Sequence, residues 1–179
     1  MKGMPRKTAA VIRMLVLDVD GVLTDGRLHF GPRGEALKLF HVRDGLGIQQ
    51  VAKAGIEVAV ISGRKSKMVD VRCRELGVEH VFQGAKDKVA VLEKLCARLK
   101  IEPSECACVG DDVPDIPVMR TVALAFAVAD AHNEARHAAH LITKLPGGHG
   151  AVREVCDYIL AHRGLPHRGR AHRPKGRAS

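Results

Sequence analysis

Six short, continuous apolar runs recur along the chain and constrain its fold more than any other feature. We interpret them as β-strands, at Met14–Leu17, Glu57–Ile61, His80–Phe82, Cys106–Val109, Ala123–Ala127 and Leu141–Thr143. Most are separated by amphipathic stretches that fit helices, at about 45–54, 65–76, 87–99 and 115–120, with a last one at about 150–162. Strands that are continuously apolar are typically buried on both faces. The pattern therefore predicts an α/β fold with a doubly wound, mostly parallel sheet, right-handed crossovers and helices on both faces.

One segment, residues 27–42, departs from this alternation. It contains two short alternating runs around a Gly-Pro-Arg-Gly turn, which is typical of a β-hairpin. Leu37 and Leu39 would lie on one face of the hairpin, with Lys38 and Phe40 on the other. Because both faces carry apolar side chains, we expect something else to cover the hairpin, such as another subunit.

The net charge of +9 is concentrated at the two ends of the chain. Residues 1–13 and 162–179 hold ten of the 29 Lys and Arg and none of the 20 Asp and Glu, so the rest of the chain is nearly neutral. We therefore expect a basic N-terminal tail at 1–12, a single domain at 13–162 and a basic, disordered C-terminal tail at 163–179.

Several function classes fit the composition poorly. Aromatic residues make up 3% of the chain and Trp is absent, which argues against a nucleic-acid surface built on base stacking. No apolar run is long enough to span a membrane, and the first run is interrupted by Arg13 and ends in acids, unlike a signal peptide. The odd number of cysteines, most of them in apolar surroundings, predicts buried free thiols and a cytoplasmic protein.

Polar residues follow several of the predicted strands. Asp18 and Asp20 follow the first strand, Ser62 ends the second, Asp111 follows the strand at 106–109, and Lys88 begins a helix. In an open α/β sheet these positions meet at the carboxyl edge, where ligands bind. Bunched carboxylates repel one another unless a cation compensates, and oxygen ligands suit Mg²⁺. Asp and Ser are also common helix caps and turn formers, but that alternative does not explain why several strand ends carry them.

The first two acids have distinct chemical roles in this hypothesis. Asp18 is the predicted nucleophile and a metal ligand, and it would form an aspartyl-phosphate. Asp20 lies two residues on and can reach the leaving oxygen once the chain turns at Gly21. It would protonate that oxygen and then activate the attacking water, while its backbone carbonyl faces the metal.

The remaining polar residues would support the phosphate and the metal. Ser62 and Lys88 are expected to hold the phosphoryl oxygens, with the lysine neutralising charge. Asp111 is expected to ligate the metal directly. Asp112 and Asp115 would help through water or by orienting Lys88.

At these residues the chain resembles the haloacid dehalogenase superfamily. DVDGVLT, Ser62, Lys88 and GDDVPD resemble its four motifs in order. The stretches FHVRDGLGI, VISGRKSKMVDVRCRELGV, AVADAH and GGHGAVREVCDYIL further resemble the 3-deoxy-D-manno-octulosonate (KDO) 8-phosphate phosphatase family. The resemblance implies a Rossmann-like fold without a large cap domain, and a role in lipopolysaccharide core synthesis. It also implies a homotetramer in which the hairpins form a shared barrel and neighbouring subunits cap each active site.

The resemblance also implies a set of substrate contacts. These are Asp20, His41, Val42, Arg43, Asp44, Gly45, Arg64, Arg72 and Lys88. The cationic members suit a substrate that carries a phosphate and a carboxylate. Two positions depart from the family pattern, because Gln49 and His149 stand where the family often has arginine.

Four other functions remain open from the sequence. A phosphatase for a nine-carbon, sialic-acid-type sugar phosphate would share the same motifs. A non-catalytic tetramerisation homologue would be expected to lack Asp18 or Asp20, and both are present. A phospho-receiver domain also combines Asp with magnesium, but its phosphorylated Asp ends a later strand. A nucleic-acid binder acting through the basic tails would show steeply salt-dependent affinity.

Overall fold

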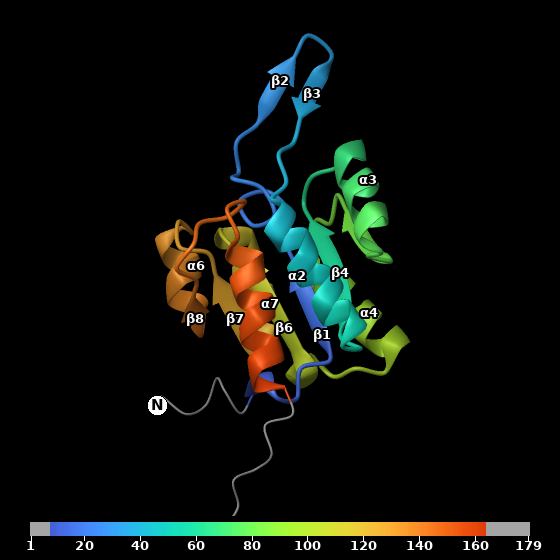
Figure 1. Ribbon diagram of the computed structural model, residues 1–179, viewed down its shortest axis with the longest axis vertical. Helices are drawn as coiled ribbons and strands as arrows, with labels where there is room; N and C mark the ends of the chain where they lie inside the picture. Colours follow the sequence, from blue (N-terminus) through green and yellow to red (C-terminus); the bar gives the residue numbers. More distant parts are fainter. Residues whose placement is uncertain (1–7, 164–179) are drawn as a thin grey trace, which may run out of the picture.

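The apolar runs form one sheet of six parallel strands, in the order β5-β4-β1-β6-β7-β8. The computed structural model describes residues 8–163 (Figure 1). The strands are β1 (Met14–Leu17), β4 (Glu57–Ser62), β5 (His80–Gln83), β6 (Cys106–Gly110), β7 (Leu124–Ala127) and β8 (Leu141–Ile142). Every boundary lies within one residue of the prediction, and the predicted α/β class is confirmed. β1 lies between β4 and β6, so the residue that follows it emerges near the middle of the carboxyl edge.

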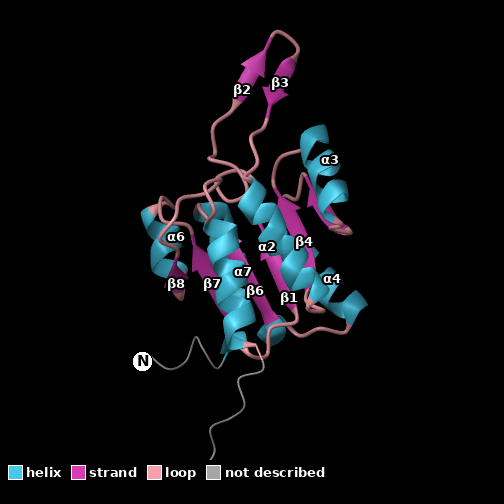
Figure 2. Ribbon diagram, viewed as in Figure 1, coloured by secondary structure: helices cyan, strands magenta, loops and turns pink. Residues whose placement is uncertain are grey.

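Helices cover both faces of this sheet (Figure 2). They are α2 (Val42–Lys53), α3 (Lys67–Leu76), α4 (Lys88–Leu99), α5 (Ile116–Thr121), α6 (Asn133–Ala138) and α7 (Ala151–His162), with short 3₁₀ turns η1 (Pro103–Glu105) and η2 (Val113–Asp115). α2 and α7 pack together in front of the sheet in Figure 1, while α4, α5 and α6 contact one another in series. Right-handed crossovers place that second group on the opposite face. α6, η1 and η2 were not predicted, because segments this short show no clear periodicity.

The core is aliphatic, as the composition requires. Leu15, Val60 and Leu124 are among its fully buried members, and all five cysteines are buried and free, as predicted. The expected boundary of the N-terminal tail at residue 12 is wrong for the last part of that segment. Ala9 and Ile12 are buried in the core, because apolar side chains next to β1 gain more from burial than from exposure. The rest of the two predicted tails, residues 1–7 and 164–179, lies outside the described residues.

The predicted hairpin is present and projects from the carboxyl edge of the sheet (Figure 1). It consists of antiparallel β2 (His29–Gly31) and β3 (Gly34–Leu37). Its large apolar side chains are exposed: Leu28 by 43%, Phe30 by 66%, Leu37 by 46% and Leu39 by 55%. Within the described residues, no helix is both long and apolar enough to cross a membrane.

Candidate active site

The segment that follows β1 carries the first acid to the middle of the carboxyl edge. The Asp18 N–H donates to the Val109 carbonyl over 3.3 Å, so the backbone there is still held beside β6. The chain then turns tightly, because the Val19 carbonyl accepts from three successive N–H groups at residues 22–24. Gly21 in this turn has a φ of +84°, which favours glycine.

Glycines allow the acids of this edge to approach one another closely. A Cβ on Gly21 would lie 2.0 Å from Oδ2 of Asp111, and a Cβ on Gly110 would lie 2.5 Å from Cβ of Asp115. Oδ2 of Asp115 accepts from the backbone N–H of Asp111 at 2.9 Å and of Asp112 at 3.4 Å. Asp115, carried by η2, therefore holds the loop that presents Asp111.

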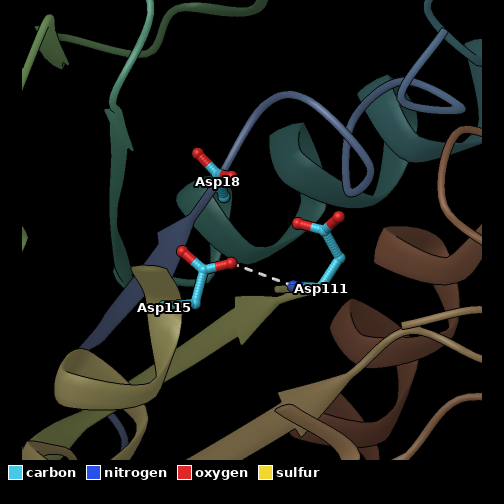
Figure 3. Close-up of side chains that lie close together, drawn as sticks. All are labelled: Asp18, Asp111 and Asp115. Carbon is cyan, nitrogen blue, oxygen red and sulfur yellow. Dashed lines mark hydrogen bonds between the residues drawn. The ribbon is translucent and has the colours of Figure 1, made fainter. Parts of the chain in front are cut away.

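Three carboxylates converge at the edge, as Figure 3 shows. Oxygens of Asp18, Asp111 and Asp115 lie within 4.8 Å of one another. Nζ of Lys88 lies 2.7 Å from Oδ1 of Asp115 and 3.0 Å from Oδ1 of Asp18. Both contacts are ion pairs between a buried ammonium and a carboxylate, and the shorter one, with Asp115, is also a well-formed hydrogen bond. Lys88 thus lies between two acids, as expected of the residue that Asp115 was predicted to orient.

Burial and mutual repulsion disfavour the ionised forms of the acids in this cluster. Burial, and then the Asp115 carboxylate, raise the pKa of Asp18 to about 6. Burial, followed by the charges of Asp115, Asp18 and Asp112, raises the pKa of Asp111 to about 8. Burial acts to lower the pKa of Lys88, but Asp18 and Asp115 outweigh it and raise that pKa. One ammonium therefore does not neutralise three carboxylates, and carboxylate oxygens that lie this close together fit a divalent cation.

Asp20 belongs to a different network from the three clustered acids. Its Oδ1 is in contact with Nζ of Lys38, and its Oδ2 lies 3.4 Å from Nε of Arg64. Both cations also contact Oε1 of Glu35, Lys38 at 3.1 Å and Arg64 at 3.2 Å. Sequence reasoning missed Lys38 and Glu35 as site residues. A signal was present, since Lys38 shares the predicted face of Phe40, which packs against the core.

A cleft of about 350 Å³ opens beside these groups. It is lined by Asp18, Asp20, Gly26, Leu28, Ser62, Gly63, Arg64, Lys88, Asp111, Asp112, Pro114 and Asp115. All predicted catalytic and metal-ligating residues are among them, together with Arg64 from the predicted substrate contacts. Ser62 is buried, with 3% of the residue exposed. Its hydroxyl oxygen accepts a hydrogen bond from the Arg64 N–H at 3.4 Å.

The other predicted substrate contacts are not brought to this cleft within one chain. His41, Asp44, Gly45 and Arg72 border a separate, much smaller cavity between α2 and α3. Val42 is 76% exposed and Arg43 is exposed, both in the first turn of α2. Gln49, on α2, and His149, before α7, also lie outside the cleft lining.

Comparison with known proteins gives consistent matches along the chain. The family model of haloacid dehalogenase-like hydrolases matches residues 37–122. The 3-deoxy-D-manno-octulosonate 8-phosphate phosphatase of Yersinia pestis is 49% identical over 152 residues, which are 85% of this chain and 81% of that protein.

Solved structures of related phosphatases have the same fold as this chain. A crystal structure of 3-deoxy-D-manno-octulosonate 8-phosphate phosphatase from Moraxella catarrhalis, in complex with magnesium, phosphate and KDO, is 42% identical with a TM-score of 0.86. The match covers 88% of this chain and 91% of that one. The cobalt-bound form of the corresponding phosphatase from Haemophilus influenzae is 41% identical with a TM-score of 0.85, covering 88% and 92%. Both of these relatives therefore hold a divalent metal.

Proposed function

Because the chain belongs to the 3-deoxy-D-manno-octulosonate 8-phosphate phosphatase family of haloacid dehalogenase-like hydrolases, we propose that it hydrolyses KDO 8-phosphate to KDO and phosphate. This reaction belongs to lipopolysaccharide core biosynthesis, and we place it in the cytoplasm. The observation that carries the proposal is the convergence of Asp18, Asp111, Asp115 and Lys88 at the carboxyl edge. The Moraxella catarrhalis relative, which binds magnesium, phosphate and KDO, supports the choice of substrate and of Mg²⁺.

Asp18 is the nucleophile in this proposal. A carboxylate oxygen of Asp18 attacks phosphorus and forms an aspartyl-phosphate as the bond to the sugar oxygen breaks. Water then attacks the same phosphorus, which releases phosphate and restores the Asp18 carboxylate. Lys88, 3.0 Å from Asp18, favours the ionised nucleophile and counters the charge of the phosphoryl group.

Asp20 moves the protons of both steps. It lines the cleft two residues after the nucleophile, and its side chain is 20% exposed. In the first step its carboxyl group gives a proton to the leaving sugar oxygen. In the second step the resulting carboxylate takes a proton from the attacking water. It can act as a base because it gave up its own proton in the first step.

The remaining residues hold the phosphoryl group and the cation. Ser62 and Lys88 bind phosphoryl oxygens from the cleft wall, and Asp115 orients Lys88. Asp18, Asp111 and the backbone carbonyl of Asp20 would hold Mg²⁺, with Asp112 supporting it through water. When bound, Mg²⁺ supplies charge stabilisation to the phosphoryl oxygens.

Substrate recognition in this proposal requires more than one copy of the chain. Arg64 lies at the cleft, but His41–Gly45 and Arg72 do not. We propose a homotetramer in which the exposed hairpins pack together and these residues of a neighbouring copy reach the sugar acid. The exposed apolar side chains of the hairpin support this assembly.

A comparison of two phosphorylated sugar acids tests the proposal. With Mg²⁺ present, phosphate release from KDO 8-phosphate should show a clearly higher kcat/KM than release from a nine-carbon, sialic-acid-type phosphate. A preference for the nine-carbon compound would assign the chain to the alternative substrate. Loss of both activities in the Asp18→Asn variant provides the control that the measured turnover belongs to this site.

A further inference from the structure

Lys38 is a buried cation that the catalytic scheme above does not use. It follows the second strand of the hairpin, and its side chain is 2% exposed. Its ammonium contacts Oδ1 of Asp20 and lies 3.1 Å from Oε1 of Glu35. Burial of an ammonium is costly without partners, so these two carboxylates define where the Lys38 side chain can lie.

The four charged groups around Asp20 form a closed, alternating arrangement. Asp20 contacts Lys38 and Arg64, and Glu35 contacts the same two cations. The two positive and two negative charges balance, so Asp20 does not face two uncompensated cations. In a neutral ring of this kind each side chain restricts the position of its two neighbours. The ring therefore orients Asp20 more strongly than a single ion pair at the surface would.

The two cations differ in how they approach Asp20. Arg64 lines the cleft and its side chain is 43% exposed, so it is the cation of this ring that an anionic substrate group in the cleft can reach. Neither Lys38 nor Glu35 is part of the cleft lining. Lys38 therefore contacts Asp20 without being part of the cleft wall, and its buried ammonium remains a partner of Asp20 when a substrate group contacts Arg64.

We propose that Lys38 is a positioning residue for Asp20, and that the hairpin thereby holds the proton-transfer group of the reaction in place. Lys38 does not touch the substrate in this arrangement. It sets the position from which Asp20 reaches the leaving oxygen, and Glu35 keeps Lys38 in that position. The hairpin consequently links the surface that we propose for assembly to the chemistry of the cleft. This inference rests on the proton-transfer role of Asp20 given under the proposed function.

The test compares two phosphate esters that differ in their need for a proton donor. The sugar oxygen of KDO 8-phosphate needs protonation to leave, whereas p-nitrophenolate is a good leaving group and needs little. We expect Lys38→Met to lower kcat/KM for KDO 8-phosphate by about 10- to 100-fold, but to leave kcat/KM for p-nitrophenyl phosphate within about threefold of the wild type. Lys38→Arg should recover part of the loss, and the exposed Lys94→Met should behave as the wild type.

Equal losses on both esters in Lys38→Met, or no loss on either, would overturn the positioning role, since a merely structural residue affects both substrates alike. Asp20→Asn is measured beside it. If Asp20→Asn shows the leaving-group dependence and Lys38→Met does not, only the inference on Lys38 fails. If Asp20→Asn shows no such dependence, both the inference and the proposed role of Asp20 fail. Thermal melts of all variants, and Glu35→Gln as a second way to loosen Lys38, separate these results from loss of folding.

Discussion

At the scale of single residues, the site is an excess of buried negative charge. Asp18 and Asp111 both have raised pKa values because burial and neighbouring carboxylates disfavour their ionised forms. Lys88 offsets part of that charge, and the divalent cation expected of this family offsets the rest. The carboxylates that oppose folding of the metal-free chain are the ones that would bind the cation, whereas Lys88 would bind the phosphoryl group. The residues of the site are thus selected for chemistry at some expense in stability.

The metal-free protein should therefore lose stability as the pH rises. The folded pKa of Asp18 is about 6 and that of Asp111 about 8, against an ordinary value of 3.8. Between pH 4 and 8 the folded state then binds more protons than the unfolded state, so the free energy of unfolding falls, by at most about 1.4 kcal/mol per pH unit for one extra proton. Thermal melts in EDTA from pH 5 to 8.5 check this. Added Mg²⁺ should restore stability at pH 8, and Asp111→Asn should weaken both the pH dependence and the Mg²⁺ effect; an unchanged pH dependence in that variant would contradict the prediction.

The Asp18→Asn variant should lose turnover but remain folded. An amide is not a nucleophile toward phosphorus, so phosphate release should fall by at least about a thousandfold. The substitution removes one of three repelling charges, so the melting temperature in EDTA should not decrease. Phosphate release and circular dichroism measure the two effects. Asp157→Asn, an exposed acid on α7, is the matched control and should retain wild-type activity.

At the scale of elements, α2 holds the start of α7. α7 has Gly150 at its N-cap, which offers no side chain to its first N–H groups. The buried Asp44 of α2 takes that part, because its Oδ1 accepts from the Arg153 N–H at 2.7 Å. The turn just before α7 in turn packs on the nucleophile loop, since Gly148 N–H donates to the Val22 carbonyl at 2.9 Å. Asp44 therefore supports the catalytic edge from a distance, through the position of α7.

Asp44→Ala should destabilise the protein by about 1–2 kcal/mol, the usual cost of losing a helix cap. Asp44→Asn should cost much less, because the amide oxygen still accepts from Arg153 N–H. Urea unfolding of the two variants measures the difference. If Asn proved as damaging as Ala, the charge of Asp44 and not its hydrogen bond would be the stabilising feature.

At the scale of the whole molecule, the proposed catalytic groups lie on the body of one chain, and the proposed assembly surface lies on the hairpin beside them. All of the carboxylates, Ser62 and Lys88 come from one chain and meet at one cleft. The hairpin projects from the carboxyl edge of the sheet (Figure 1). Its Phe30 and Leu39 are more than half exposed. A single chain therefore contains the chemistry, while in our proposal the neighbouring copies complete recognition of the sugar and exclude water from the cleft.

Phe30→Glu should accordingly dissociate the assembly and affect the two kinds of substrate unequally. A charge on the exposed hairpin would have to be buried between subunits, so the mass in solution should fall to the 19.4 kDa of one chain. Activity on KDO 8-phosphate should fall about tenfold or more, whereas activity on p-nitrophenyl phosphate should fall less. Light scattering and initial rates check this, with Val11→Glu, on an exposed apolar residue at the opposite end of β1, as the control. A wild-type protein that is already monomeric would exclude the tetramer.

The sequence by itself determined the sheet, the hairpin and the acids at the carboxyl edge. Continuous apolar runs such as Met14–Leu17 that alternate with amphipathic stretches favour parallel strands buried on both faces, and that geometry brings Asp18, Ser62 and Asp111 to one edge of the sheet. The tertiary structure alone decided how the charges pair. Asp115 joins the cluster with Asp18 and Asp111, whereas the side chain of Asp20 turns to Lys38 and Arg64. The pairing of cations with acids depends on the path of the hairpin and on the position of η2. Contacts between residues far apart in the chain set both, and the local sequence pattern does not predict such contacts. The periodicity of a sequence indicates which face of an element is buried, but it does not indicate which side chain of another element will contact that face.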